Sequence, residues 1–300
     1  MRIAVTGSSG LVGRELIRYL EQQGDFVTRI VRAVASAQEI HWDPAKGEID
    51  SAALEGFDCV IHLAGENIGD RRWTAAQKAR IQESRVKGTT LLSHTLAKLE
   101  RKPRIFISAS AIGFYGDRGE YVCDESTSNG GGFLADVCVA WESATEPAVR
   151  AGIRVVNLRI GVVLSPQGGA LQKMLLPFKL GAGGIIGNGR QFWSWIIIDD
   201  LIRAIEHCLR TDSLHGPVNA VSPHPVMNLD FTKALGRVLH RPTIVPMPGF
   251  LARIALGEMA DALLLASTRV VPNRLLETQF SFRYPELEPA LKHVLGRVGD

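Results

Sequence analysis

Three glycines near the N-terminus restrict the fold of this 300-residue chain more than any other feature. They follow an apolar run at 3–5 and precede residues 14–21, whose pattern is typical of a helix. In a strand–turn–helix of this kind, the first glycine permits a tight turn, the second lets the backbone approach a pyrophosphate, and the third lets the helix pack closely on the strand. The free N–H groups at the helix start favour the same anion. Unless the glycines serve the turn alone, we expect a dinucleotide at Gly7, Ser8, Ser9, Gly10, Leu11, Val12 and Gly13.

The end of the second predicted strand, Phe26–Val31, is where such a fold distinguishes NAD from NADP. An acidic residue there would bond the ribose 2′-hydroxyl of NAD, whereas an arginine accommodates the 2′-phosphate of NADP. Arg32 follows this strand, and no Asp or Glu lies between positions 27 and 37. Ser8 and Ser9 can donate to the same phosphate. We therefore expect NADP(H) to be favoured over NAD; the alternative is that Arg32 is an ordinary surface charge.

Strand and helix patterns alternate along the first half of the chain. Further strands are predicted at 39–42, 57–63, 104–108 and 154–158, and helices at 74–98, with Thr74 as N-cap, and at 133–150. This alternation predicts an α/β fold with a Rossmann-like, doubly wound parallel sheet. Ligands of such sheets bind at the carboxyl ends of the strands. We therefore expect cofactor contacts from Leu63, Ala64, Gly65, Glu66 and Ser108.

The second half of the chain has a different pattern. Residues 161–189 are rich in glycine, so we expect little regular structure and a wall or lid over a substrate pocket, or else a plain connecting loop. Asp199 and Asp200 are predicted to cap a helix at 201–210, and Asn228 or Asp230 a helix ending near residue 239. We predict a dinucleotide-binding domain at 1–245, with pocket segments at 161–193 and 211–230, and a small, mostly helical C-terminal domain at 246–300.

Composition argues against several classes of partner. The chain has 34 basic and 31 acidic residues, and a net charge of +3 does not favour nucleic acid or an anionic membrane. Its four cysteines include no Cys-x-x-Cys pair, which argues against a zinc site or a disulfide framework. No leader pattern precedes the first strand, and no uncharged apolar run reaches the ~18 residues of a membrane span. We therefore expect a cytoplasmic protein with a small-molecule substrate and no metal.

A series of motifs resembles the extended short-chain dehydrogenase/reductase proteins, which include NAD(P)-dependent epimerases, dehydratases and reductases acting on nucleotide-sugars. The motifs are TGSSGLVG (6–13), DCVIHLAG (58–65), RVKGT (85–89), SAS (108–110) and YG (115–116). A closer resemblance is to the YfcH-like "epimerase family" proteins. It is carried by HLAGENI (62–68), RW (72–73), LLPFKLG (175–181), GNGR (187–190), WI (195–196) and SPHPV (222–226). It implies a Rossmann domain followed by a short C-terminal domain of unknown function.

The resemblance does not carry over the usual catalytic set. The typical enzymes use Asn, Ser or Thr, Tyr and Lys, with the tyrosine moving a proton while hydride moves to or from the nicotinamide. With Glu142 aligned as the downstream glutamate, the tyrosine position is Leu134 and the lysine position is Cys138. The asparagine position is Arg85, so only Ser110 matches.

Other side chains are candidates for the missing chemistry. We predict Ser110 and Tyr115 as catalytic residues, although Tyr115 as a packed aromatic is the alternative. Arg85 is predicted to bind a cofactor phosphate or a substrate carboxylate in bidentate fashion. His224 is placed in a substrate loop, and His62 is expected in the core rather than as a base.

Two functions from different classes remain. The first is an NADP(H)-dependent oxidoreductase or epimerase acting on a small polar, sugar-like metabolite with a non-standard catalytic set. The second is a non-catalytic regulatory protein that senses NADPH. By fold analogy, a homodimer through the two long helices of the first domain is also expected.

Overall fold

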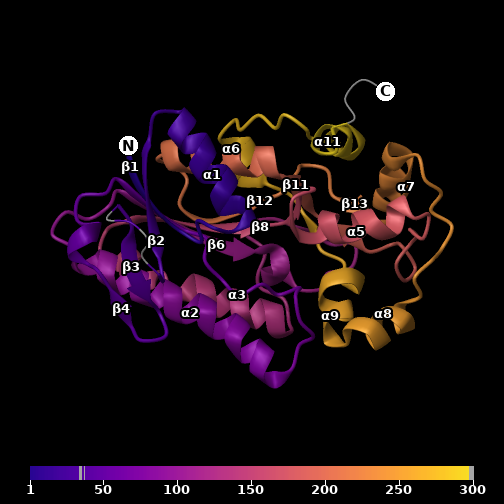
Figure 1. Ribbon diagram of the computed structural model, residues 1–300, viewed down its shortest axis with the longest axis horizontal. Helices are drawn as coiled ribbons and strands as arrows, with labels where there is room; N and C mark the ends of the chain where they lie inside the picture. Colours follow the sequence, from indigo (N-terminus) through magenta and orange to yellow (C-terminus); the bar gives the residue numbers. More distant parts are fainter. Residues whose placement is uncertain (34–35, 37, 297–300) are drawn as a thin grey trace.

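The computed structural model describes residues 1–33, 36 and 38–296. An eight-stranded sheet forms its centre (Figure 1). Its strands lie in the order β12 (Gly216–Ala220), β8 (Arg154–Ile160), β6 (Ile105–Ala111), β5 (Cys59–His62), β1 (Arg2–Thr6), β2 (Phe26–Val31), β3 (Ile40–Asp43) and β4 (Glu48–Ile49). Neighbouring strands are parallel except for β3 and β4. The predicted doubly wound parallel sheet is confirmed.

Helices cover both faces of this sheet (Figure 1). One face carries α1 (Leu11–Gln22) and α6 (Ile198–Arg210), and the other carries α2 (Ala75–Lys98), α3 (Phe133–Ser143) and α4 (Glu146–Arg150). Successive strand residues point to opposite faces. Ile3 and Val5 therefore pack in the core beneath α1 and α6, whereas Ala4 packs in the core beneath α2.

The remaining helices are α5 (Gly169–Lys179), α7 (Asn228–Leu239), α8 (Gly249–Leu256), α9 (Glu258–Ala260), α10 (Asn273–Glu277) and α11 (Leu287–Val294). Three small sheets pair β7 (Val122–Cys123) with β14 (Arg269–Val270), β9 (Val162–Leu164) with β11 (Trp195–Ile197), and β10 (Phe192–Trp193) with β13 (Val226–Met227). Short turns of 3-10 helix lie at Ala52–Leu54 and Ile112–Tyr115, and one of π-helix at Asp261–Leu265.

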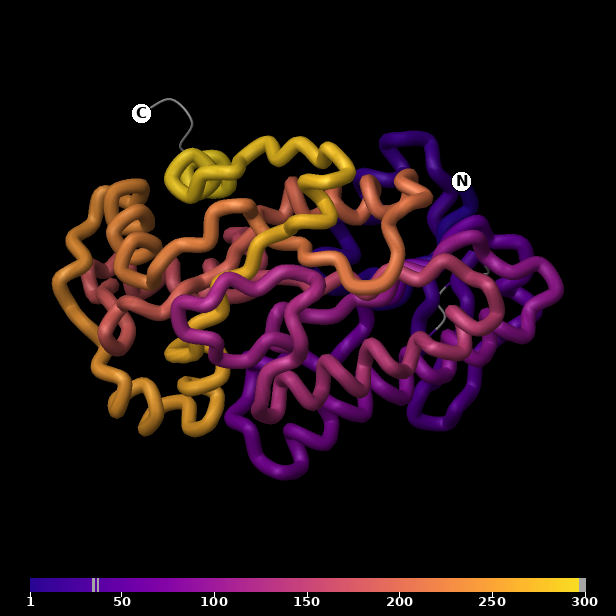
Figure 2. Tube along the Cα trace, turned by 180° about the vertical axis from the view of Figure 1, so that it is seen from behind, coloured from indigo at the N-terminus to yellow at the C-terminus, as the bar shows by residue number. Residues whose placement is uncertain are grey.

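Helices α5, α7, α8, α9 and α11 form a smaller lobe beyond one end of the sheet (Figures 1 and 2). A second core holds α5, α7 and α11 together around the buried residues Leu175, Trp195, Phe231 and Leu291. Figure 2 shows the yellow C-terminal chain leaving this lobe toward the sheet and returning to it. The β7–β14 pair lies on that path and joins the two halves of the chain.

The predicted helix at 133–150 is two helices. α3 ends at Ser143, and α4 begins at Glu146 with a proline in its first turn. Pro147 has no N–H, and its ring clashes with the carbonyl four residues earlier, which is that of Ser143. The helix therefore ends at this residue.

The expectation of little regular structure at 161–189 is wrong. This segment contains β9 and the eleven-residue helix α5. Leu171, Leu175 and Phe178 are spaced four and three residues apart and are buried in the second core. This apolar face outweighs the helix-breaking tendency of the surrounding glycines.

Two predicted caps are also wrong. α6 begins at Ile198 without a side-chain cap, and Asp200 instead accepts the backbone N–H groups of Arg283 and Tyr284, each at 2.9 Å. α7 begins at Asn228, whose Oδ1 accepts the N–H of Ile186 at 2.9 Å. Both side chains accept hydrogen bonds from backbone groups that are distant in sequence. A buried polar group needs such a partner, and here the tertiary fold supplies it.

The N-cap of α2 was predicted correctly. The Thr74 side chain accepts the Gln77 N–H at 3.2 Å, which satisfies one unpaired donor at the helix start. At 24 residues this is the longest helix described, and within the described residues no helix is both long and apolar enough to span a membrane.

Candidate functional site

The turn between β1 and α1 requires glycine at its first and third glycine positions. Gly7 has a φ of +67°, and a Cβ there would stand 2.7 Å from the carbonyl carbon of Leu63. A Cβ on Gly13 would stand 2.2 Å from the Gly7 oxygen. The first glycine thus lets β1 approach β5, and the third lets α1 pack on the turn, as the sequence predicts.

The second glycine faces a less crowded place. Among the described residues, a Cβ on Gly10 would meet only the Gly7 oxygen within 4 Å, at 3.2 Å. No side chain caps the N-terminus of α1, so the N–H groups of its first turn have no side-chain acceptor. Backbone donors and space at a helix start fit a dinucleotide pyrophosphate.

Thr6 joins the glycine turn to the end of β5. Its Oγ1 accepts the N–H groups of Leu63 and Ala64 at 3.2 and 3.3 Å, and lies 2.7 Å from Nδ1 of His62. Because Thr6 Oγ1 already accepts two hydrogen bonds, we assign its hydroxyl as the donor to His62 Nδ1. The neutral imidazole then carries its own proton on Nε2. Residues 63–64 are thus positioned against Gly7 by hydrogen bonds as well as by packing.

His62 lies in the core, as expected. It is fully buried, and burial, together with the charge of Arg85, lowers its pKa to about 3. The ring is neutral at physiological pH, so His62 supplies no charge to the site. Its buried Nε2 has no hydrogen-bond partner among the described residues.

Three neighbouring strands place a row of polar side chains at the same level of the sheet. Ser110 of β6 is in register with Arg159 of β8, which is in register with Asn219 of β12. All three are almost fully buried. They lie toward the carboxyl ends of parallel strands, where ligands of open α/β sheets bind.

Glu142 of α3 anchors this row. Its carboxylate takes two charge-assisted hydrogen bonds from Arg159, at 2.8 Å each, and one from the Ser110 hydroxyl at 2.7 Å. The pair is buried, with 4% of the Arg159 side chain and 13% of the Glu142 side chain exposed. Because the serine proton is committed to Glu142, the lone pairs of Ser110 Oγ remain as acceptors.

Tyr115 lies at the far end of the same network. Its hydroxyl donates to Asn219 Oδ1 at 2.8 Å and accepts from Arg159 at 3.0 Å, and the residue is fully buried. Burial raises the pKa of Tyr115 to about 12. This placement favours the packed-aromatic alternative, in which Tyr115 positions Arg159 rather than moving a proton.

The α3 positions that correspond to the usual Tyr and Lys are apolar. A Cβ on Gly113 would lie 3.2 Å from the Leu134 Cβ and 3.8 Å from the Cys138 sulfur, so both side chains pack against the turn after β6. Burial raises the pKa of Cys138 to about 11, which leaves a thiol without nucleophilic character.

Arg85 of α2 reaches the end of β5. Its Nη1 donates to the carbonyls of Glu66 and Ile81 at 3.0 and 3.1 Å, and its guanidinium lies over the ring of Trp141, 4.9 Å from the centroid. A Cβ on Gly65 would stand 3.3 Å from the Arg85 Cζ. Glycine at 65 thus makes room for this guanidinium.

The remaining predicted residues are spread around the same edge. Arg32 is exposed directly after β2 and forms no ion pair with the described residues, and Glu66 is partly exposed near Arg80. Ser108 is fully buried within β6, which favours a structural role. His224 pairs with Glu286 at 3.3 Å in an exposed position.

Sequence reasoning missed several residues of this site. It used Glu142 only to align α3, and it did not single out Arg159, Asn219 or Trp141. Arg159 and Asn219 each lie inside a mostly apolar strand, and this pattern was the available signal. A polar or charged side chain at a buried position needs a partner, so it indicates a buried polar network. Within the described part of the chain, no group of His, Cys, Asp and Glu has the arrangement of a metal site.

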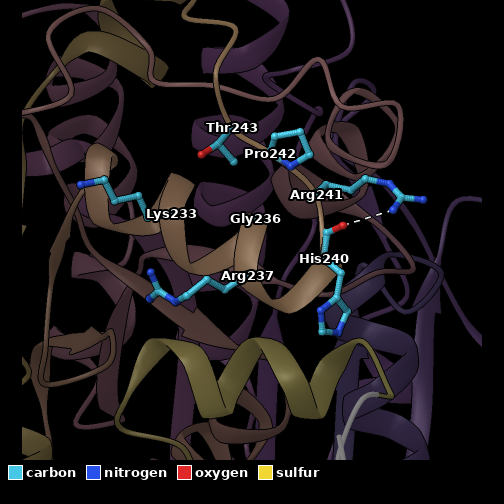
Figure 3. A pocket seen from close by; sticks show the side chains of 7 residues that line it. All are labelled: Lys233, Gly236, Arg237, His240, Arg241, Pro242 and Thr243. Carbon is cyan, nitrogen blue, oxygen red and sulfur yellow. Dashed lines mark hydrogen bonds between the residues drawn. The ribbon is translucent and has the colours of Figure 1, made fainter.

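A separate hollow lies around the C-terminal end of α7 (Figure 3). It has a volume of about 620 Å³ and is lined by Lys233, Gly236, Arg237, His240, Arg241, Pro242 and Thr243. Figure 3 shows that Lys233 and Arg237 extend away from Arg241. These diverging basic side chains do not form a convergent site.

The parallel sheet, the glycine turn and the serine at the end of β6 together define a dinucleotide-binding short-chain dehydrogenase/reductase fold of the extended type. The family model described as "NAD dependent epimerase/dehydratase family" matches residues 3–220, and the "Domain of unknown function (DUF1731)" matches residues 247–294. The chain therefore belongs to the NAD-dependent epimerase/dehydratase family, which confirms the resemblance inferred from the motifs.

Relatives match over nearly the whole chain. The chain is 43% identical over 298 residues to "Epimerase family protein Mb2239" of Mycobacterium bovis, covering 99% of this chain and 98% of that protein. It is 34% identical to human "Epimerase family protein SDR39U1", covering 98% and 100%.

Solved structures agree with this assignment. The crystal structure of human epimerase family protein SDR39U1 with NADPH matches with a TM-score of 0.92 at 32% identity, covering 99% of this chain and 100% of that chain. The nucleoside-diphosphate sugar epimerase from Corynebacterium glutamicum matches with a TM-score of 0.81 at 38% identity. It covers 99% of this chain but only 58% of that longer chain.

Proposed function

We propose that this protein is an NADP(H)-dependent oxidoreductase or epimerase that acts on a small polar, sugar-like metabolite. The glycine turn carries this proposal, because Gly7 and Gly13 are required by backbone packing while Gly10 leaves space at an uncapped helix N-terminus. The structure of human SDR39U1 with NADPH supports the choice of NADP(H).

The predicted contacts are assigned as follows. The backbone of residues 7–13 binds the pyrophosphate, and Arg32, with Ser8 and Ser9, binds the 2′-phosphate. Residues 63–66 follow β5, whose neighbour β1 leads into the glycine turn, and flank the nicotinamide half of the cofactor. The exposure of Arg32 and its lack of an ion pair with the described residues leave its guanidinium available for this contact.

The bound nicotinamide would donate or accept a hydride. Ser110 Oγ, whose proton is donated to Glu142, accepts a hydrogen bond from a substrate hydroxyl and orients it. The Glu142–Arg159 pair fixes this orientation of the serine, because both carboxylate oxygens are held by the same guanidinium. Tyr115 and Asn219 support Arg159 from its other side.

A non-catalytic NADPH sensor is the second candidate. The apolar residues Leu134 and Cys138 favour it, because they occupy the positions of the usual proton-transfer pair. The polar row favours the enzyme, because a sensor does not need three buried polar side chains beside the nicotinamide end of the sheet.

A turnover screen separates these candidates. Protein incubated with NADPH and a panel of small aldehydes, ketones and keto-sugars is expected to oxidise NADPH, and Ser110→Ala to slow this at least ~10-fold without weakening NADPH binding. Binding of NADPH with neither its oxidation nor interconversion of epimers for any sugar of the panel supports the sensor, because an epimerase returns the hydride to its product and consumes no NADPH. An unchanged rate in Ser110→Ala would exclude Ser110 from catalysis.

We further propose a cytoplasmic location. All four cysteines are buried and unpaired, which fits a reducing compartment. A homodimer through the two long predicted helices, which correspond to α2 and to the α3–α4 pair, stays a prediction.

A further inference from the structure

Arg85 is a half-buried cation that the described residues leave without a carboxylate. Its Nη1 is used twice, by the carbonyls of Glu66 and Ile81. No described residue accepts a hydrogen bond from its Nε or Nη2, and none forms an ion pair with it. The edge of the guanidinium that carries Nε and Nη2 is therefore a free pair of parallel donors.

Two buried or partly buried arginines of β8 show how this chain compensates the charge of a guanidinium that is removed from water. Arg159 is held by both oxygens of Glu142, and Arg154 donates to three nearby carbonyls through Nη1 and pairs with Asp212 at 3.5 Å. A desolvated charge is costly unless a partner of opposite sign or several hydrogen bonds compensate it. Arg85 has two such bonds, both through one nitrogen.

The surroundings of Arg85 hold a second uncompensated polar group. Trp141, on which the guanidinium lies, is 95% buried, and its Nε1 has no hydrogen-bond partner in the described part of the chain. The Trp141 ring orients the plane of Arg85 while leaving the edge of the guanidinium available. Trp141 Nε1 is a buried donor without a partner, and the unpaired edge of the partly buried Arg85 beside this ring is open to an acceptor from outside the chain.

The position of Arg85 points to the substrate rather than to the cofactor phosphates. The α1 N-terminus and Arg32 are already assigned to the pyrophosphate and the 2′-phosphate. Arg85 is tied to α3 through Trp141, and the next residue of α3, Glu142, holds Ser110. Arg85 and Ser110 are thus placed through consecutive residues of one helix.

From these observations we propose that Arg85 binds a carboxylate group of the substrate, through Nε and Nη2, beside the nicotinamide. The planar edge of a guanidinium matches the two oxygens of a carboxylate, and burial against Trp141 strengthens the pairing. The inference rests on the proposed function and narrows its substrate class from polar metabolites to acidic ones, such as a sugar acid or a hydroxy acid.

Anion binding to the NADPH-loaded protein tests this proposal without an assay of turnover. Calorimetric titrations use malonate as the carboxylate, inorganic phosphate as the alternative oxyanion, and malonamide as the neutral analogue, all at constant ionic strength. We expect malonate to bind and malonamide not to bind. Arg85→Gln is expected to lose at least ~10-fold in malonate affinity while NADPH affinity changes less than ~2-fold.

Lys87→Gln is the matched control, because it removes one positive charge from the same helix at an exposed residue. It should bind malonate like the wild type. Arg85→Lys keeps the charge but not the planar edge, and it is expected to bind malonate more weakly than the wild type. It carries the test if Arg85→Gln does not fold.

The outcomes are distinguishable from failure of the proposed function. If NADPH does not bind the wild type, the proposed function fails, and malonate is then titrated into the free protein. The carboxylate site is overturned if malonate fails to bind the wild type, if phosphate binds more tightly than malonate, or if both Arg85 variants bind malonate like the wild type. A ~10-fold loss of NADPH affinity in Arg85→Gln overturns it too, because Arg85 then belongs to the cofactor site.

Discussion

The buried pair of Glu142 and Arg159 is central to the site at the scale of single residues. Both side chains are removed from water, a state whose cost is offset only when the geometry is good and the remaining polar atoms are bonded. Here the guanidinium holds both carboxylate oxygens, and Ser110 and Tyr115 bond to the pair from either side. Orientation of Ser110 therefore depends on the whole network.

Removing the charge of Glu142 should destabilise the protein strongly. We expect Glu142→Gln to lower the free energy of unfolding by about 3 kcal/mol, because it leaves a buried guanidinium without its counter-charge. Urea unfolding measures this. The control is Glu146→Gln, which breaks an exposed pair with Arg150 on the next helix and should cost at most ~0.5 kcal/mol. Equal effects of the two substitutions would contradict the assigned role.

Glu125 gives the protein a titration that is visible in its stability. Burial raises the pKa of Glu125, its Oε1 accepts the N–H groups of Asn219 and Arg274, and its Oε2 has no partner among the described residues. A carboxyl whose pKa is raised on folding contributes stability at low pH that is lost as the pH rises through the folded-state pKa. Glu125 thus opposes folding at neutral pH.

Replacing Glu125 by glutamine should remove this dependence. We expect Glu125→Gln to be more stable than the wild type at pH 8, with a smaller difference at pH 5, since the amide keeps the Oε1 acceptor without the charge. Urea unfolding at both pH values measures the two differences. A variant that is less stable than the wild type at pH 8, or a difference that shrinks as the pH rises, would show that the charge is compensated in the folded state.

At the scale of elements, the C-terminal helix α11 is part of the structure rather than an appendage. Leu291 is fully buried in the second core, with Leu171 of α5 and Leu235 of α7. The same core fixes α5, whose preceding Gly168 packs against Leu11 at the start of α1, with a Cβ–Cδ2 separation of 3.3 Å if a Cβ were present. Packing of the small lobe thus reaches the glycine turn.

Truncation of Leu291 tests this coupling. We expect Leu291→Ala to lower the free energy of unfolding by about 2–5 kcal/mol, which is the range for buried leucines. Thermal unfolding of this variant should still show a single transition. Leu180→Ala, at a residue that is 74% exposed, should change the free energy of unfolding by less than ~0.5 kcal/mol. A separate low-temperature transition in Leu291→Ala would mean that the lobe folds independently of the sheet.

Element predictions succeeded where the signal was local. The Thr74 cap, β2 at Phe26–Val31 and the extent of α2 are determined by nearby residues. Predictions failed where a distant segment decided the outcome. The sequence predicts Asp200 as a helix cap, but its carboxylate oxygens accept the backbone N–H groups of residues 283–284. The glycines of 161–189 suggested a loop, yet the second core holds a helix there.

At the scale of the whole molecule, the sheet and the glycine turn were predictable because each follows from short-range periodicity and spacing. The polar row of Ser110, Arg159 and Asn219 was not, because it depends on the register between β6, β8 and β12. Nor did spacing place Arg85 against Trp141, since these residues come from different helices. Sequence thus predicted the sheet and the glycine turn better than it predicted the polar row.

The central claim, that the turn at 7–13 binds NADP(H) and that Arg32 selects it, is tested most directly by calorimetric titration of NADPH and NADH. Wild-type protein should bind NADPH at least ~10-fold more tightly than NADH, since a charge-assisted hydrogen bond from a guanidinium to a phosphate is worth about 1.5–3 kcal/mol. Arg32→Asp should abolish or reverse this preference, and Gly10→Val should abolish binding of both. Absence of binding by the wild type, or unchanged affinities in both variants, would contradict the account.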